Sequence, residues 1–165
     1  MRKVFLLTGF NNWGKTWLIQ RLFPRQNLPR ERFYKGSLYD FSGYSFCVMP
    51  QSNDDLGKDG YEAAYQERMD ALAQSGTKPN YIFSAFCPTR EPQNMSDDIL
   101  RNLYSTDQII LIPIEYKWCG HAKLQLNEIT QFYSSFANLS VQPISQIGPT
   151  TKLQALQKIV QSCLP

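Results

Sequence analysis

The residues most able to do chemistry lie in one short loop near the start of the chain, bounded by Gly9 and Gly14 and closed by Lys15 and Thr16. Glycines let a backbone wrap closely round a ligand with its N–H groups pointing inward. An ammonium group and a hydroxyl at the end of such a loop would supply a positive charge for phosphate oxygens and a ligand for Mg²⁺. This segment, which we call the Gly9–Thr16 loop, is predicted to cradle a chain of phosphates.

The flanking segments favour a phosphate site over an accidental glycine turn. The apolar run Lys3–Thr8 is typical of a buried strand, and apolar residues at helical spacing follow in Trp17–Phe23. A helix that begins at the loop directs the positive end of its dipole at a bound anion. We therefore expect Lys15 to act on the reacting phosphate as well as to bind it. The expected nucleotide-binding residues of this region are Gly9, Asn11, Asn12, Trp13, Gly14, Lys15, Thr16 and Trp17.

The rest of the chain alternates between strand and helix patterns. Strands are expected at 3–8, 36–41, 44–49, 81–86, 108–114 and 139–144. Helices are expected at 17–23, 61–72, 96–103, 126–136 and 153–163. We expect Ser96 to cap the third helix and Thr150 or Thr151 to cap the last. Segments 24–31 and 50–60, which are rich in turn-forming residues, are predicted as loops.

This alternation predicts an α/β fold. We expect a mostly parallel sheet of about six strands, with one antiparallel hairpin strand and helices on both faces. At 165 residues the chain is expected to form a single domain, 1–165. No apolar run approaches the length of a membrane span, so we expect no membrane partner.

Composition narrows the classes of function. The cysteines are scattered, at Cys47, Cys87, Cys119 and Cys163, which is typical of reduced thiols in a cytoplasmic protein. His121 is the sole histidine, so the sequence supports neither a zinc site nor a histidine-activated nucleophile. Basic residues outnumber acidic ones in residues 1–35. They could contact a nucleic acid, but we favour a solvated loop beside a site for a polyanion.

Written as G-x-x-x-x-G-K-[ST], the Gly9–Thr16 loop resembles the phosphate-binding loop of the P-loop NTPase superfamily. The predicted order of elements, with a hairpin directly after the first helix, resembles a small Ras-like G domain over essentially the whole chain. The resemblance implies the three-layer sandwich of P-loop NTPases, with Mg²⁺ and either GTP or ATP as cofactors.

The resemblance also implies further metal ligands beside Thr16. Ser37 lies where that family places a threonine that binds Mg²⁺, although a serine at a strand edge needs no function. Asp54 and Gly57 match the spacing of the family's Asp-x-x-Gly, so Asp54 or Asp55 is the expected acidic ligand. A turn that caps the following helix is the alternative interpretation of these aspartates.

Base recognition departs from the family pattern. The family's Asn-Lys-x-Asp is replaced by a segment in which Glu115, Lys117 and Trp118 could contact a base without selecting guanine. An ordinary, partly buried aromatic residue is the alternative for Trp118. Arg90 is a candidate arginine for the phosphates, with an ion pair to Glu91 as the alternative.

We therefore expect binding and slow, Mg²⁺-dependent hydrolysis of a nucleoside triphosphate, GTP or ATP, by a switch or assembly component that acts on a protein partner. A small-molecule or nucleotide kinase is one alternative, although the basic residues of 91–165 are dispersed and do not form a lid. A nucleotide-binding module that does not hydrolyse, held in a larger complex, is the other.

Overall fold

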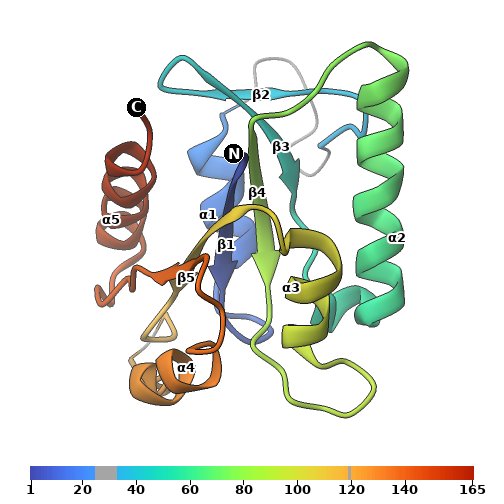
Figure 1. The fold of residues 1–165 in the computed structure, drawn as a ribbon. Coiled ribbons are helices and arrows are strands. Elements are labelled where there is room, and N and C mark those ends of the chain that lie inside the picture. Colours follow the sequence, from blue (N-terminus) through green and yellow to red (C-terminus); the bar gives the residue numbers. More distant parts are fainter. Residues whose placement is uncertain (25–32, 119) are drawn as a thin grey trace.

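The computed structural model describes residues 1–24, 33–118 and 120–165 (Figure 1). The strands in these ranges are β1 (Lys3–Thr8), β2 (Tyr39–Phe41), β3 (Tyr44–Met49), β4 (Tyr81–Phe86), β5 (Gln108–Pro113) and β6 (Leu139–Val141). The helices are α1 (Lys15–Leu22), α2 (Asn53–Gln74), α3 (Ser96–Tyr104), α4 (Leu126–Phe132) and α5 (Pro149–Ser162). None of these helices combines the length and apolar character that crossing a membrane requires.

All six strands of the described ranges form one sheet in the order β2-β3-β4-β1-β5-β6. Only β2 and β3 pair antiparallel, and every other neighbouring pair is parallel. The predicted α/β fold, with a mostly parallel sheet of six strands and one hairpin, is therefore confirmed. Helices α1 and α5 pack together on one side of the sheet, and α2 and α3 pack together on the other (Figure 1).

Burial of both sheet faces explains the continuous apolar character of the central strands. The side chains of β1 from Val4 to Thr8 are buried, as are those of β4 from Ile82 to Phe86. Parallel strands covered by helices on both faces lose the alternation seen in half-exposed sheets. The first and fourth strands were therefore predictable from uninterrupted apolar runs.

The predicted loop at 50–60 is wrong from Asn53 onward, because α2 begins there. Ser52 precedes the helix, and its backbone N–H donates a 3.0 Å hydrogen bond to Asp55 Oδ2 in a capping-box arrangement. This box satisfies groups that would otherwise be unpaired at the helix start. Gly57, with φ of +69°, kinks the helix, and its low helix propensity made the segment look like a loop.

Other helix boundaries also differ from prediction. Helix α5 begins at Pro149 with Gly148 as its N-cap, so neither Thr150 nor Thr151 caps it. Proline suits the first helical position because its missing N–H would have no partner there. Met95, not Ser96, is the N-cap of α3, and the Ser96 hydroxyl instead shares a 2.6 Å hydrogen bond with the Tyr133 hydroxyl.

The remaining differences are shorter. Helix α1 begins two residues earlier than the pattern indicated, at Lys15, and α4 ends at Phe132. Strand β6 ends at Val141, and an isolated parallel bridge from Ile114 to Ile144 continues the pairing beyond it. The predicted loop at 24–31 lies, apart from its first residue, outside the described residues, as does residue 119.

Candidate functional site

The Gly9–Thr16 loop curves from the end of β1 into the start of α1. Asn12 and Gly14 have positive φ angles, of 62° and 84°, which turn the backbone back on itself. The Gly9 N–H donates a 3.1 Å hydrogen bond to the Phe86 carbonyl at the end of β4, which anchors the loop to the sheet edge. The predicted loop between strand and helix is therefore present, with Lys15 as the first residue of the helix.

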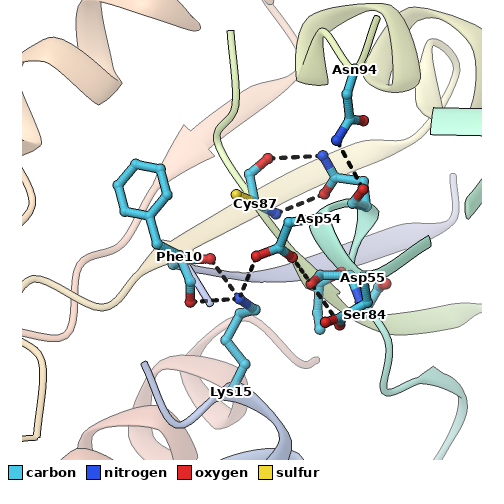
Figure 2. Close-up of polar contacts among 11 residues, drawn as sticks. Phe10, Lys15, Asp54, Asp55, Ser84, Cys87 and Asn94 are labelled. Carbon is cyan, nitrogen blue, oxygen red and sulfur yellow. Dashed lines mark hydrogen bonds and ion pairs between the residues drawn. The ribbon is translucent and has the colours of Figure 1, made fainter. Parts of the chain in front are cut away.

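Lys15 lies across this loop. Its Nζ donates hydrogen bonds to the carbonyl oxygens of Gly9, at 2.6 Å, and Phe10, at 2.9 Å. The side chain is only 7% exposed. Figure 2 shows the ammonium group between these carbonyls and the carboxylate of Asp54, whose Oδ2 is 3.9 Å from Nζ. The expected phosphate-binding lysine is thus buried at the mouth of the loop.

The surroundings of Lys15 shift the pKa of its ammonium group. Burial lowers its pKa below the ordinary value of 10.5, and the charge of Asp54 offsets part of that shift. Desolvation penalises the charged form of a lysine, whereas a nearby anion favours it. A bound phosphate chain would supply additional negative charge at this buried cation.

A cavity of about 400 Å³ lies against the loop and the first turn of α1. It is lined by Asn11, Asn12, Trp13, Gly14, Lys15, Thr16, Trp17, Asp55 and Trp118. We call it the loop cavity. It brings together the predicted binding residues of 11–17, one of the two aspartates and the aromatic residue predicted to contact a base. Cavities of this volume suit small ligands and cofactors.

Trp118 is brought to the loop by tertiary contacts. A Cβ atom built on Gly14 would lie 2.0 Å from Cζ2 of the Trp118 ring, so that ring rests directly on the glycine. The ring also meets Trp17 edge-on at a centroid distance of 5.3 Å, and Lys152 Nζ lies 4.8 Å from its centroid. The loop cavity is therefore bordered by residues of the loop and by the side chains of Trp17 and Trp118.

Asp54 and Asp55 both belong to the first turn of α2. The Ser52 hydroxyl donates to Asp54 and, at 3.0 Å, to Asp55, so the capping interpretation describes their local contacts. The same turn also directs Asp54 to Lys15 and Asp55 into the loop cavity. Capping and a site role are therefore compatible, because the helix start points at the loop.

A cysteine follows the strand that lies beside β1. That strand is β4, which separates β1 from β3, and Cys87 comes directly after it. Burial, followed by the charge of Asp54, raises the pKa of Cys87 to about 12. The thiol therefore keeps its proton at neutral pH and is a poor nucleophile or base.

Asn53 is a site residue that sequence reasoning missed. Its side chain makes two hydrogen bonds with the backbone of Cys87: the Cys87 N–H donates to Oδ1 at 2.7 Å, and Nδ2 donates to the Cys87 carbonyl at 3.1 Å. Asn94 Nδ2 donates to the Asn53 carbonyl at 2.8 Å. These bonds, drawn in Figure 2, tie the start of α2 to the end of β4 and so position Asp54. The sequence did offer one signal for this role: Asn53 is an amide residue directly before the two aspartates at the start of the helix.

Several predicted residues lie away from the loop cavity. Arg90 stacks on the Phe132 ring at 4.3 Å. Among the ion pairs of the described residues, none joins Arg90 to Glu91. It lines a separate cavity of about 560 Å³ with Phe10 and Lys123. Its predicted action on the phosphates stays a prediction.

Ser37 and the residues around Trp118 are also separate from the cavity lining. Ser37 lies in a turn before β2, where its N–H donates to the Tyr34 carbonyl at 3.3 Å. The Lys117 N–H donates to the Ala122 carbonyl at 3.0 Å. Glu115 forms an ion pair with Lys123 at 3.2 Å. Roles for Ser37 with a metal and for Lys117 with a base stay predictions.

The basic residues of the N-terminal region are described only in part. Arg25, Arg30 and Arg32 lie outside the described residues. Arg21 stacks over the Trp17 ring at 3.9 Å, and Lys35 forms an ion pair with Glu67. These two described residues are therefore engaged with neighbouring side chains.

The residues present fit an Mg²⁺ ion that arrives with phosphates. Among the described residues, no group of three or more His, Cys, Asp or Glu could hold a metal ion. Thr16 and Asp55, however, contribute a hydroxyl and a carboxylate to one cavity. Mg²⁺ is commonly held by one or two protein oxygens, with waters and substrate phosphates completing its shell.

The chain was compared with protein-family models, with curated proteins and with solved structures. No family model matches it, and no curated protein or solved structure is significantly similar to it.

Proposed function

We propose that the Gly9–Thr16 loop binds the phosphates of a nucleoside triphosphate together with Mg²⁺. The observation that supports this most strongly is the buried Lys15 ammonium, which lies over the loop carbonyls beside Asp54. A phosphate chain in the loop cavity would accept hydrogen bonds from the loop amides and attract Lys15 Nζ away from the carbonyls. The phosphates would be a stronger partner for the buried ammonium than the loop carbonyls, because hydrogen bonds between two ionised groups are stronger than those to a neutral acceptor.

In the proposed complex Thr16 and Asp55 would hold Mg²⁺, whose charge would offset that of the outer phosphates. Trp118 and Trp17 border the same cavity and would contact the base there, and an aromatic contact does not distinguish adenine from guanine. The proposal therefore covers both ATP and GTP.

Hydrolysis by the chain alone is proposed to be slow. Cys87 keeps its proton and Asp54 is engaged with Lys15, so neither is well suited to activate water. A second positive charge at the phosphates accelerates phosphoryl transfer by a factor of about 10³ to 10⁵ in enzymes that have one. We propose that a protein partner supplies this second charge, so that the chain acts as a switch or assembly component.

The test is equilibrium binding of ATP and GTP, with Mg²⁺, to the wild type and to Lys15→Ala. Truncating one member of a buried charge contact costs about 2–5 kcal/mol, so we expect affinity to fall by roughly 30-fold or more. Lys158→Ala, an exposed lysine on α5, is the matched control and should bind as the wild type does. Absence of binding by the wild type, or equal binding by Lys15→Ala, would contradict the proposal.

A further inference from the structure

A second cavity, of about 910 Å³, begins where the loop cavity ends. The two share Thr16 and Asp55, the residues proposed to hold Mg²⁺. The other lining residues are Gln20, Phe33, Tyr34, Lys35, Gly36, Pro50, Gln51 and Arg68. We call this the second cavity. A ligand inside it would lie beside the outermost phosphate of a nucleotide held in the loop cavity.

Arg68 gives the second cavity a buried positive charge. The side chain is 8% exposed and donates only to backbone carbonyls, those of Val48 at 3.2 Å, Ala64 at 3.4 Å and Phe33 at 3.5 Å. Within the described residues no carboxylate lies within 4.0 Å of it, and the neighbouring Glu67 pairs with Lys35 instead. Burial lowers the pKa of Arg68, as expected for a cation without a close anion.

A buried guanidinium that lacks an anionic partner is costly, because desolvation is repaid only by good charge contacts. The planar fork of arginine matches the oxygens of a phosphate or carboxylate and binds them with two parallel hydrogen bonds. Lys35 at the rim is exposed and paired with Glu67, so Arg68 is the charge that an anion in the cavity would meet. The ring of Tyr34, also exposed, supplies an apolar wall. The cavity therefore combines a buried charge for an anion with room for an attached organic body.

We propose that the second cavity binds a small organic anion, with its phosphate or carboxylate group at Arg68, and that this anion accepts the γ-phosphoryl group. This inference rests on the binding of the nucleoside triphosphate and Mg²⁺ proposed above, and not on the protein partner. An ionised oxygen of the anion attacks the γ-phosphorus, and a new P–O bond forms as the bond to the β,γ-bridging oxygen breaks. The electron pair of the broken bond stays on the departing nucleoside diphosphate. Because the attacking oxygen is already ionised, no proton needs to move.

Anion binding is tested with inorganic phosphate as the probe. The loop cavity is first filled with Mg²⁺ and a non-hydrolysable triphosphate analogue, and phosphate is then titrated into the complex by calorimetry. We expect one saturable phosphate site in the wild type. Arg68→Met, which replaces the buried charge with an apolar side chain of similar length, should lose the site. Gln51→Glu, which adds a negative charge to the cavity lining, should weaken it at least 10-fold.

Gln154→Glu is the matched control, because it converts another exposed glutamine, on α5 and outside the lining of the cavity. It should bind phosphate as the wild type does. Binding of the triphosphate analogue shows that each variant is folded, and if Arg68→Met fails that check, Gln51→Glu decides. Absence of a saturable site, or an unchanged site in Gln51→Glu and in folded Arg68→Met, overturns the inference. Failure of the analogue itself to bind the wild type refutes the proposed function instead.

Transfer is tested with ATP labelled at the γ-phosphate and a panel of sugar phosphates, nucleoside monophosphates and dicarboxylates. We expect label in an organic product, and a rate of nucleoside diphosphate formation that rises at least 10-fold with the accepted compound. Label that appears only in inorganic phosphate, at the same rate with every compound, would refute phosphoryl transfer.

Discussion

The contact between Gly14 and Trp118 supports a quantitative prediction. A methyl group at position 14 would lie 2.0 Å from Cζ2 and 2.3 Å from Cε2 of the indole, so Gly14→Ala forces the ring or the loop to move. Trp17 and Lys152 hold the ring on other sides, so its displacement disturbs further contacts. Overpacking of this kind costs about 1–3 kcal/mol.

The backbone adds a second penalty. Gly14 has φ of +84°, and an L-residue in the left-handed region costs roughly 1–2 kcal/mol. Gly14→Ala should therefore lower the free energy of unfolding by about 2–5 kcal/mol in total. Gly43→Ala is the matched control: its φ is +81°, but no atom lies within 4 Å of the added methyl group. The free energy of unfolding of Gly43→Ala should therefore fall only by the backbone penalty.

Urea denaturation of a double-mutant cycle separates the two penalties. In the Trp118→Ala background the steric penalty disappears, so Gly14→Ala should cost only about 1–2 kcal/mol, close to Gly43→Ala. The cycle should yield a coupling energy of about 1–3 kcal/mol between positions 14 and 118. Equal losses for Gly14→Ala in both backgrounds would show that the ring does not rest on the glycine.

Three further predictions follow from single contacts. Because burial holds the pKa of Lys15 below 10.5, nucleotide affinity should fall as pH rises through that lowered pKa. Lys15→Arg, whose guanidinium stays charged, should not show this fall in binding titrations. Gly57→Ala should lower the free energy of unfolding by about 1–2 kcal/mol, because its φ of +69° suits glycine, and a loss near zero would argue against the kink. Asn53→Ala should cost about 2–4 kcal/mol in urea denaturation by leaving two buried backbone groups of Cys87 unpaired, and an unchanged midpoint would contradict that pairing.

Local patterns were sufficient for the central elements of the fold. Uninterrupted apolar runs predicted Lys3–Thr8 and Tyr81–Phe86 with the boundaries that the structure has, because strands covered on both faces have few polar residues. The glycines that bound the loop, with the lysine that follows them, likewise indicated the turn from strand to helix. The start of α2 was missed because Gly57 lowers helix propensity, while the compensating contacts between Ser52 and Asp55 depend on geometry.

Local patterns could not predict which segments, distant in the sequence, lie side by side in the fold. A strand pattern carries no information about which strand lies beside it, so the position of β4 between β1 and β3 emerged only in the structure. The approach of Asp54 to Lys15 and the contact of Trp118 with Gly14 depend on that arrangement and on the loops beyond the strands. The buried guanidinium of Arg68 was also missed. Its spacing from Tyr65 and Leu72 places it on the buried face of α2, but the sequence does not show whether an arginine at such a position has an anionic partner.

The decisive experiment for phosphate binding by the Gly9–Thr16 loop is a crystal structure with Mg²⁺ and a non-hydrolysable triphosphate analogue. We expect phosphates within the loop, Lys15 Nζ moved from the Gly9 and Phe10 carbonyls to phosphate oxygens, and the metal between Thr16 and the outer phosphates. A nucleotide bound elsewhere, with Lys15 still donating to both carbonyls, would contradict it.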